Sequence, residues 1–556
     1  MLAWREMKGG EKNDCVPLED LVSGIPRGEL EELWEQLGFD GILGPCKGRP
    51  VFSLARDIVG FYDSEVLAQK PIRDALLLNY EKEAFRLVKQ YSGVSRRMKD
   101  WPSLLIPKWQ RGGVMPVSFC EAFRISPKYA GETSPPKPPT IEELGPRPVV
   151  HPLMPFQEDL CQQIVEAVRN QEACRIMASL PTGAGKTRVA VNAIMRLQEE
   201  LGGVVLWIGN TKEVCEQAAS TYKAVYENHP PDFPGRIHRL WENHSLKDDF
   251  LSGFLVAGIA KLGALDRKNK VVRRLRDAVT LIVFDEAHHA VARTYKQTLR
   301  FFAGTPNIPR THLVGLTATP GRGIDPDGSQ VKALVKEFGA QMLVPSQFGK
   351  KNPVLVLQRE GILSRFRVVS KAGCEVLASE DERTQIERFA NYPASLLRRI
   401  GGDESRNELI IQQVTRDNTN QKTIVFACDV QQAELLAYQW RTRNVSARAI
   451  SANTHASLRR KWIRDFVEGG IRVLVNVGVL TTGFDAPIVR RLIMARPTAS
   501  PVLFEQMIGR GLRGPKFGGT ENCTVIDIVD SIKFHGRPRG FQKFEHDWMK
   551  GKRLKH

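Results

Sequence analysis

Short runs of apolar, mostly β-branched residues recur from about residue 151 onwards and alternate with stretches of helical spacing. Each run predicts a buried strand, because a strand of a parallel sheet is covered on both of its faces. The predicted strands are 204–208, 281–284, 312–316, 423–427, 472–477, 492–495 and 524–529. Strands that alternate with helices predict an α/β fold with parallel sheets. Only the first half of this block contains a glycine-rich loop, and the second half begins near Thr415.

The N-terminal part of the chain has a different pattern. Its apolar residues are spaced for one face of a helix, most clearly at Leu30, Leu33, Trp34 and Leu37. This spacing predicts a mostly helical accessory domain. The proline-rich run 134–139 then predicts an extended linker.

These changes in pattern divide the chain into six parts. Between the two α/β blocks lies a charged segment with weaker strand signals, which predicts a connector. The C-terminal stretch holds eight Lys and Arg residues against two acidic ones. The predicted parts are an accessory domain (1–130), a linker (131–150), a first α/β domain (151–345), a connector (346–414), a second α/β domain (415–530) and a basic tail (531–556).

Composition narrows the class of protein. The 556 residues are 42% hydrophobic and 26% charged, as in globular proteins, and the net charge of +18 favours a polyanionic partner such as nucleic acid. No apolar run approaches the ~18 residues of a membrane helix, and no hydrophobic stretch follows the charged N-terminus. The nine cysteines form no Cys-x-x-Cys pair, which predicts reduced thiols in a cytoplasmic protein without a zinc site.

A glycine-rich loop follows the first strand region. Residues 179–187 read Ser-Leu-Pro-Thr-Gly-Ala-Gly-Lys-Thr and lead into a helical pattern. Glycines let consecutive backbone N–H groups approach phosphate oxygens, and the start of a helix adds its positive dipole end. The loop therefore predicts an ATP site in which Lys186 reaches the terminal phosphates and Thr187 holds Mg²⁺. The loop residues expected to bind the nucleotide are Thr182, Gly183, Ala184, Gly185, Lys186 and Thr187.

Two adjacent carboxylates end the predicted strand 281–284. Asp285 and Glu286 follow four apolar residues, so they lie at the carboxyl end of the strand, where ligands bind in open α/β sheets. Asp285 is expected to hold Mg²⁺ through water, and Glu286 to orient or deprotonate the attacking water. His288 is expected to link this site to its neighbours.

These two motifs and those that follow resemble superfamily 2 helicases and translocases of the DEAH type. The resemblance covers about residues 151–530 and is to the branch of type I and type III restriction motors and bacterial repair helicases. It implies two tandem RecA-like domains, with ATP and Mg²⁺ as cofactors. It also implies that Gln157, in Pro155-Phe156-Gln157, reads the adenine, although Met154 stands where the family often has arginine.

Three later motifs extend the resemblance. Leu316-Thr317-Ala318-Thr319-Pro320 resembles the motif that couples hydrolysis to domain movement, which gives Thr317 and Thr319 this role. Residues 479–487 resemble a second motif, which places Gly483 and Asp485 at the nucleotide.

The third motif, residues 506–513, ends in two arginines that share a helical face. A guanidinium brought to the γ-phosphate stabilises the charge that spreads during phosphoryl transfer. By resemblance, Arg510 and Arg513 act in this way from the second domain, while Gln506 contacts the nucleotide or its water.

Contacts to nucleic acid are less readable from the sequence. Translocating motors hold the backbone through N–H groups, hydroxyls and basic side chains. Family members contact a nucleic-acid strand through residues just beyond the β-strand that corresponds to 204–208. At this place the chain has Asn210, Thr211 and Lys212. Lys261 and Thr481 are predicted in comparable loops.

The sequence thus predicts an ATP-dependent helicase or translocase, with DNA favoured over RNA. It leaves open an autonomous repair helicase, the motor of a restriction or phage-defence system, and an ATPase switch or clamp that does not unwind. Residues 1–130 show no nuclease pattern, since Asp74, Glu81 and Lys82 lie in a helical stretch. Their Leu and Trp stripes favour docking of a partner protein over binding of DNA.

Overall fold

A computed structural model of the chain describes most of its residues. They are 15–90, 109–131, 139–144, 152–228, 233–247, 250–318, 329–349, 351–389, 391–417, 419–479, 488–498, 501–511, 513–534 and 537–538. Thr319, Thr481, Gly483 and Asp485 lie outside the described residues, as do the side chains of Gln506 and Arg510.

The chain forms two compact units. The first unit contains residues 1–136, 411–418 and 429–475, and the second contains 137–410, 419–428 and 476–556. Each unit therefore combines segments that are far apart in the sequence.

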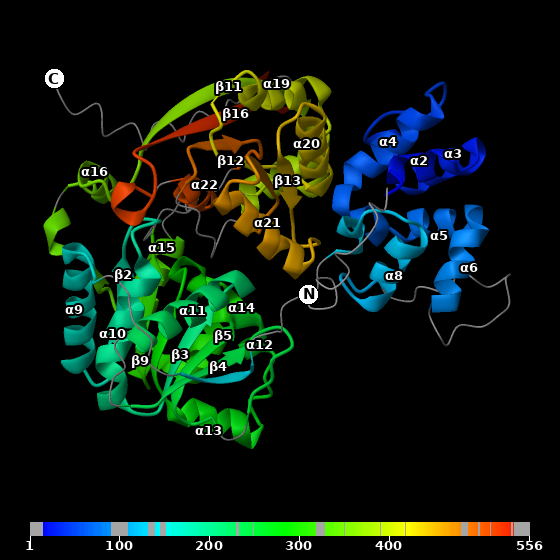
Figure 1. Ribbon diagram of the computed structural model, residues 1–556. Helices are drawn as coiled ribbons and strands as arrows, with labels where there is room; N and C mark the ends of the chain where they lie inside the picture. Colours follow the sequence, from blue (N-terminus) through cyan, green and yellow to red (C-terminus); the bar gives the residue numbers. More distant parts are fainter. Residues whose placement is uncertain are drawn as a thin grey trace. The chain divides into compact units, whose positions relative to one another are not determined.

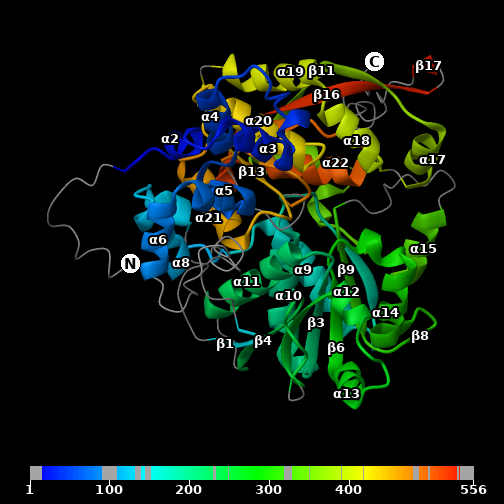
Figure 2. The ribbon, with the colours of Figure 1, turned by 90° about the vertical axis from the view of Figure 1, so that its right-hand side faces the viewer.

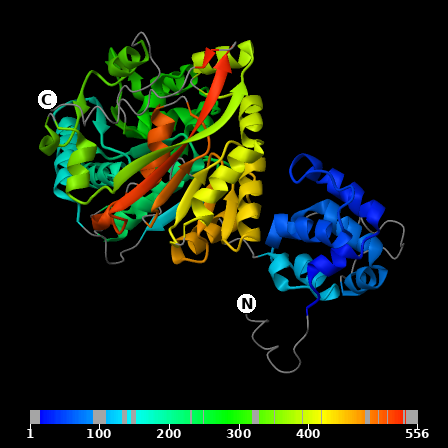
Figure 3. The same cartoon turned by 90° about the horizontal axis from the view of Figure 1, so that it is seen from above.

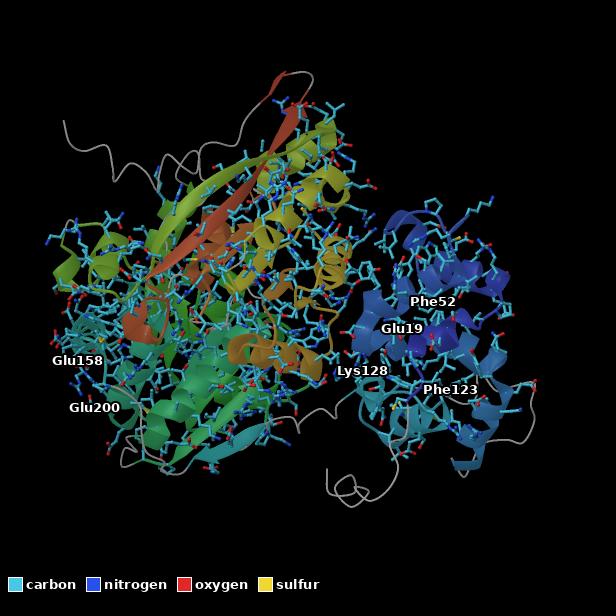
Figure 4. All side chains as sticks on the ribbon, turned by 45° about the horizontal axis from the view of Figure 1, so that its top comes forward. Glu19, Phe52, Phe123, Lys128, Glu158 and Glu200 are labelled. Carbon is cyan, nitrogen blue, oxygen red and sulfur yellow. The ribbon has the colours of Figure 1, made fainter. Side chains whose placement is uncertain are left out.

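Helices make up the N-terminal part of the first unit, as the apolar spacing predicted. They are α2 (Leu18–Ser23), α3 (Arg27–Gln36), α4 (Val51–Tyr62), α5 (Lys70–Asn79), α6 (Glu81–Gln90) and α8 (Val114–Ala122). Leu30, Leu33 and Trp34 are buried in their common core. Phe123 belongs to this core, whereas 54% of Phe52 of α4 is exposed; both residues are labelled in Figure 4.

The rest of the first unit comes from the second α/β block. It contains the end of α19 (Glu404–Thr415), then α20 (Val430–Thr442), β13 (Ala447–Ile450), α21 (Ala456–Glu468) and all but the last residue of β14 (Val473–Asn476). Strands and helices alternate here along the chain, as predicted.

An eight-stranded sheet occupies much of the second unit, in the order β1-β4-β5-β3-β6-β9-β2-β10. All its neighbouring strands are parallel except β1 and β4. The strands are β1 (Ile141–Leu144), β2 (Arg175–Ser179), β3 (Val204–Gly209), β4 (Gly235–Leu240), β5 (Gly253–Gly258), β6 (Val279–Phe284), β9 (His312–Thr317) and β10 (Met342–Leu343).

Helices cover this sheet on both faces (Figure 1). In Figure 2, α10 (Lys186–Leu201) and α11 (Lys212–Asn228) lie on one side of the strands, and α14 (Arg293–Ala303) and α15 (Ser329–Glu337) lie on the other. Every residue of β2, β3 and β9 is buried, and burial on both faces is why β3 reads as a continuous apolar run. The other helices around it are α9 (Pro155–Arg169), α12 (Ile259–Gly263) and α13 (Lys270–Ala278).

A second set of parallel strands lies in the same unit, in the order β11-β16-β15-β12. They are β11 (Arg365–Leu377), β16 (Asn522–Phe534), β15 (Arg491–Met494) and β12 (Thr423–Phe426). Figure 3 shows the two long strands, β11 and β16, side by side across the top of this region. The two sets of parallel strands and the helical N-terminal part confirm the predicted fold class.

The predicted connector, 346–414, is more structured than its sequence suggested. It contains β11, which pairs with β16 from Arg365 to Leu377 around one irregularity, and so adds an edge strand to the second sheet. It also holds the helices α16 (Pro353–Arg359), α17 (Glu380–Phe389) and α18 (Ala394–Gly401). The exact domain boundaries remain a prediction.

No helix among the described residues is both long and apolar enough to cross a bilayer.

One fully buried ion pair joins the start of α19 to β16. The Arg406 guanidinium donates to both carboxylate oxygens of Asp530, at 2.6 and 2.9 Å, and to the carbonyl of Ala495 at 2.5 Å. Both charged side chains have no exposed surface. The N–H of Cys374 on β11 donates to the same carboxylate at 3.1 Å, so one buried charge ties several segments of this region together.

We predict that Asp530→Ala lowers the free energy of unfolding of the second unit by about 3–5 kcal/mol, because it leaves the Arg406 charge buried without its partner. Urea titration followed by circular dichroism measures the change. Glu158→Ala is the matched control, since Glu158 (labelled in Figure 4) forms an exposed pair with Arg196 and its removal should change little. Equal effects of the two substitutions would contradict the prediction.

Candidate functional site

Three neighbouring strands of the first sheet end at the same edge and carry the candidate site. The sheet order places β9 between β6 and β2. The phosphate loop follows β2, Asp285 follows β6, and Thr317 is the last residue of β9. The Leu180 N–H donates to the Thr317 carbonyl at 3.2 Å, so the loop begins directly beside the end of β9.

The phosphate loop requires its glycines. Gly183 and Gly185 have φ angles of 84° and 90°, which side chains rarely allow. Gly185 is the N-cap of α10, so the helix begins at Lys186, followed by Thr187. The predicted strand, turn and helix are therefore all present, with Ala184 buried and the other loop residues partly exposed.

The two carboxylates differ in their surroundings. Asp285 is only 6% exposed, and its Oδ1 accepts the Glu286 N–H at 2.9 Å. Burial and the adjacent Glu286 charge raise the pKa of Asp285 to about 7, while the nearby Lys186 opposes this rise. Such a buried carboxylate gains stability from a cation, so it fits a magnesium ion that arrives with ATP.

Glu286 has an unusual backbone. Its φ and ψ are 52° and 54°, in the left-handed region. For a residue other than glycine this conformation is strained, and such strain is concentrated at functional sites. It lets the chain turn from β6 into the helical turn 287–291 and leaves the side chain only partly buried.

His288 lies next to the carboxylates. Its Nδ1 is 3.5 Å from Glu286 Oε2, and its ring centroid is 4.1 Å from that of His289. Burial lowers the pKa of His288 to about 4, with further lowering by His289, and burial also lowers the pKa of His289. Both imidazoles are therefore neutral at pH 7. Among the described residues, neither ring nitrogen of His288 has a hydrogen-bond partner.

Gln157 lies beneath the phosphate loop. Its Oε1 accepts the N–H of Met154 at 3.0 Å, its Nε2 donates to the Ala184 carbonyl at 2.9 Å, and it is 1% exposed. A Cβ at Gly185 would collide with this amide. The geometry thus makes Gln157 a support for the loop, and its reading of adenine remains a prediction.

The third motif reaches the phosphate loop through Gly509. A Cβ at Gly509 would collide with Thr182, and the Gly509 carbonyl is 3.8 Å from a Cβ built on Gly183. The next residue is Arg510, whose backbone continues the turn 509–511. Arg513 is partly buried, and its carbonyl accepts the Ser364 hydroxyl at 2.6 Å. The structure thus brings the backbone of this motif to the loop.

Two contacts at the loop were not singled out from the sequence. Leu363 Cδ2 lies 3.4 Å from a Cβ built on Gly183, but Leu363 belongs to the segment predicted as a connector. Gly509 could have been found, because a glycine inside a helical motif signals close backbone approach.

The predicted nucleic-acid residues follow β3 and β5. Lys212 begins α11 and pairs with Glu242 at 2.7 Å. Lys261 lies in the short helix α12, not in a loop as predicted, and donates to the Glu242 carbonyl at 2.9 Å. Both ammonium groups are therefore close to one exposed residue. Asn210 Oδ1 is buried and has no hydrogen-bond partner in the described part of the chain, and the Thr211 hydroxyl accepts the Val214 N–H at 3.3 Å.

Comparison with protein families matches both halves of the α/β block. Residues 151–322 match the type III restriction enzyme res subunit, and residues 405–514 match the helicase conserved C-terminal domain.

Among curated proteins, a 51.5 kDa protein of Lactococcus phage (isolate 7-9) is 26% identical over 382 residues, covering 67% of this chain and 68% of that protein. The putative ATP-dependent helicase IRC3 of Saccharomyces cerevisiae is also 26% identical, covering 68% and 51%. The EcoKI type I restriction endonuclease subunit of Escherichia coli is 24% identical, covering 77% and 38%. The chain thus spans between about a third and two thirds of these relatives' lengths.

Solved structures with a similar trace include the Hef helicase domain of Pyrococcus furiosus, 17% identical with a TM-score of 0.41, covering 72% of this chain and 98% of that one. The type ISP restriction-modification enzyme LlaBIII bound to DNA is 14% identical with a TM-score of 0.49, covering 69% and 28%.

The two matched families occur here in one chain, in the order that the motifs implied, and the first of them contains the phosphate loop and the paired carboxylates. The protein therefore belongs to the superfamily 2 helicases, the ATP-hydrolysing motors whose restriction-type and C-terminal helicase domains it carries in tandem.

Proposed function

We propose that this helicase is a DNA translocase or helicase that couples ATP hydrolysis at the edge of the first sheet to movement along DNA. One observation carries the proposal. The phosphate loop, Asp285 and Thr317 end three adjacent strands, and Gly509 of the second RecA-like domain packs against Thr182 of that loop. A site assembled from two domains converts nucleotide binding into domain closure.

The roles of the site residues follow from this arrangement. Lys186 and the N–H groups of residues 182–187 bind the phosphates, while Thr187 and Asp285 hold Mg²⁺. Bound Mg²⁺ neutralises charge on the phosphate oxygens and orients them. Glu286 positions the attacking water, and the neutral imidazole of His288 can donate or accept a hydrogen bond beside it.

Residues of the third motif complete the site. Arg510 directly follows the glycine that touches the loop, so we assign its guanidinium to the γ-phosphate. Arg513 and Gln506 are assigned to the same nucleotide through the resemblance, as are Gly483 and Asp485. Thr317 and Thr319 are assigned to coupling, since Thr317 is fully buried beside the loop.

The substrate and the setting are part of the proposal. The net charge of +18 suits a polyanion. The residues that we assign to contacts with the nucleic-acid strand are Asn210, Thr211, Lys212, Lys261 and Thr481. The likeness to restriction subunits supports a motor of a restriction or phage-defence system, with a protein partner bound through the N-terminal domain. The sequence Asp285-Glu286-Ala287-His288 supports the DEAH type, and nine free cysteines support a cytoplasmic location.

We predict that Lys186→Ala and Glu286→Gln each lower ATP turnover at least about 100-fold, since they remove a phosphate ligand and the group that positions water. Steady-state phosphate release and binding of a fluorescent ATP analogue measure the two effects. The Glu286 variant keeps nucleotide binding, whereas the Lys186 variant loses most of it. Wild-type turnover in either variant would refute the assignment.

The packing of Gly509 on Thr182 predicts a steric test. Gly509→Ala places a methyl group against the Thr182 side chain, so domain closure and DNA-stimulated turnover should fall about 10-fold or more.

Thr182→Ser removes the methyl that the new Cβ meets but keeps the hydroxyl, so the double variant should recover part of the activity. Thr182→Ser alone is the matched control. Full activity of Gly509→Ala would show that this contact is absent from the active state.

We further predict that duplex DNA stimulates ATP hydrolysis more than RNA does, measured at stated salt. Displacement of a third strand from a triplex, together with separation of duplex strands, distinguishes the possible motors. Strand separation indicates a helicase, triplex displacement alone indicates a duplex translocase, and neither indicates the alternative switch or clamp. Stronger stimulation by RNA would favour an RNA helicase.

A further inference from the structure

A face of the N-terminal helical domain packs on α20 and β13 of the second RecA-like domain. Both belong to the first compact unit. Tyr438 of α20 is 7% exposed and belongs to the hydrophobic core cluster of the N-terminal helices. Its ring centroid is 5.7 Å from that of Phe61, and a Cβ on Gly60 would lie 3.2 Å from its ring. The two segments therefore share a packed core at this face.

A buried carboxylate lies at the centre of this docking face, which we define as Asp57, Gly60, Phe61 and Asp63 against Tyr438, Arg441 and Arg448. The Tyr438 hydroxyl donates to Asp57 Oδ1 at 2.6 Å, and Arg49 pairs with Oδ2. Asp57 is 6% exposed. A buried carboxylate is costly unless its oxygens are hydrogen-bonded, so the charge within α4 depends partly on a donor from α20.

Two arginines complete the docking face at the end of α4. The last carbonyls of a helix lack partners within it. Arg441 Nη2 donates to two of them, Gly60 at 3.0 Å and Phe61 at 2.9 Å, and its positive charge suits the negative end of the helix. Arg448 of β13 pairs with Asp63, the C-cap of α4, at 2.5 Å.

We propose that the N-terminal domain is fixed to the second RecA-like domain as a rigid arm. ATP-driven closure then moves this arm, and any partner bound to it, relative to the first RecA-like domain. The part that concerns ATP rests on the proposed function. The attachment itself does not, because it depends only on the buried contacts of the docking face. A loosely tethered domain would not need a helix cap and a carboxylate donor from its neighbour.

Distances between paired spin labels test the arm. Cys15 and Cys46 are first replaced by serine, since the other cysteines are buried. One label pair joins exposed positions on the arm and on α21, Leu78→Cys and Glu468→Cys. The second pair joins Leu78→Cys to Glu199→Cys on α10 of the first RecA-like domain.

The first pair should give one narrow distance distribution, unchanged by a non-hydrolysable ATP analogue with DNA. The second pair should shift when the analogue binds. A broad distance distribution for the first pair, or one that shifts as much as that of the second pair, would overturn the proposal of a rigid arm. A narrow, constant first distribution with a constant second one would support the attachment but contradict ATP-driven closure, so the two failures are distinguishable.

Variants of the docking face complete the test. Gly60→Leu wedges the face open, and Tyr438→Phe with Arg441→Met removes the donors to Asp57 and to the end of α4, so each should broaden the first distribution. Phe52→Ala is the matched control, because Phe52 lies on the same helix with 54% of its surface exposed. Circular dichroism establishes that each variant is folded. An unchanged narrow distribution in a folded Gly60→Leu protein would overturn the proposal.

Discussion

The parallel order of β6, β9 and β2 is the constraint on which the proposed nucleotide site depends. Parallel strands expose their carboxyl ends at one edge, and each of these three ends in a residue or loop of the site. The sheet is buried on both faces, and this packing holds the three strand ends in place at one edge. Asp285 can then remain buried beside Glu286 and Lys186, with a pKa near neutrality that a bound cation would lower.

The support for this edge comes from segments outside the phosphate loop. Gln157, at the start of α9, forms hydrogen bonds to backbone groups with both the oxygen and the nitrogen of its amide. One of these bonds is to Ala184 and so holds the loop in place. The backbone of Gly509 lies close to Thr182 and Gly183 of the loop. The phosphate loop is thus contacted both by the amide of Gln157 and by the backbone of the third motif.

The sequence was most informative where strands are central and least informative at edges. β3, β6 and β9 are covered on both faces, so their apolar runs predicted them within one or two residues. β11 has only one neighbour in the described sheet, and exposed residues interrupt its pattern, which is why its segment was predicted as a connector. The contact of Gln157 with the loop could not be predicted from the sequence for another reason. A motif gives a residue type and an order, whereas the hydrogen bonds that Gln157 accepts from the Met154 N–H and donates to the Ala184 carbonyl appear only in the structure. Its reading of adenine stays a prediction.

The contact between Asp57 and Tyr438 also has a consequence for synthesis of the chain. The two residues are 381 positions apart, and ribosomes add about 5–20 residues per second. The N-terminal helices are therefore made roughly 20–80 seconds before the tyrosine that completes their core. During that interval, Asp57 Oδ1 and the carbonyls of Gly60 and Phe61 lack the donors that α20 supplies in the folded protein. The helical domain therefore completes its contacts only after α20, which lies later in the chain, has been translated.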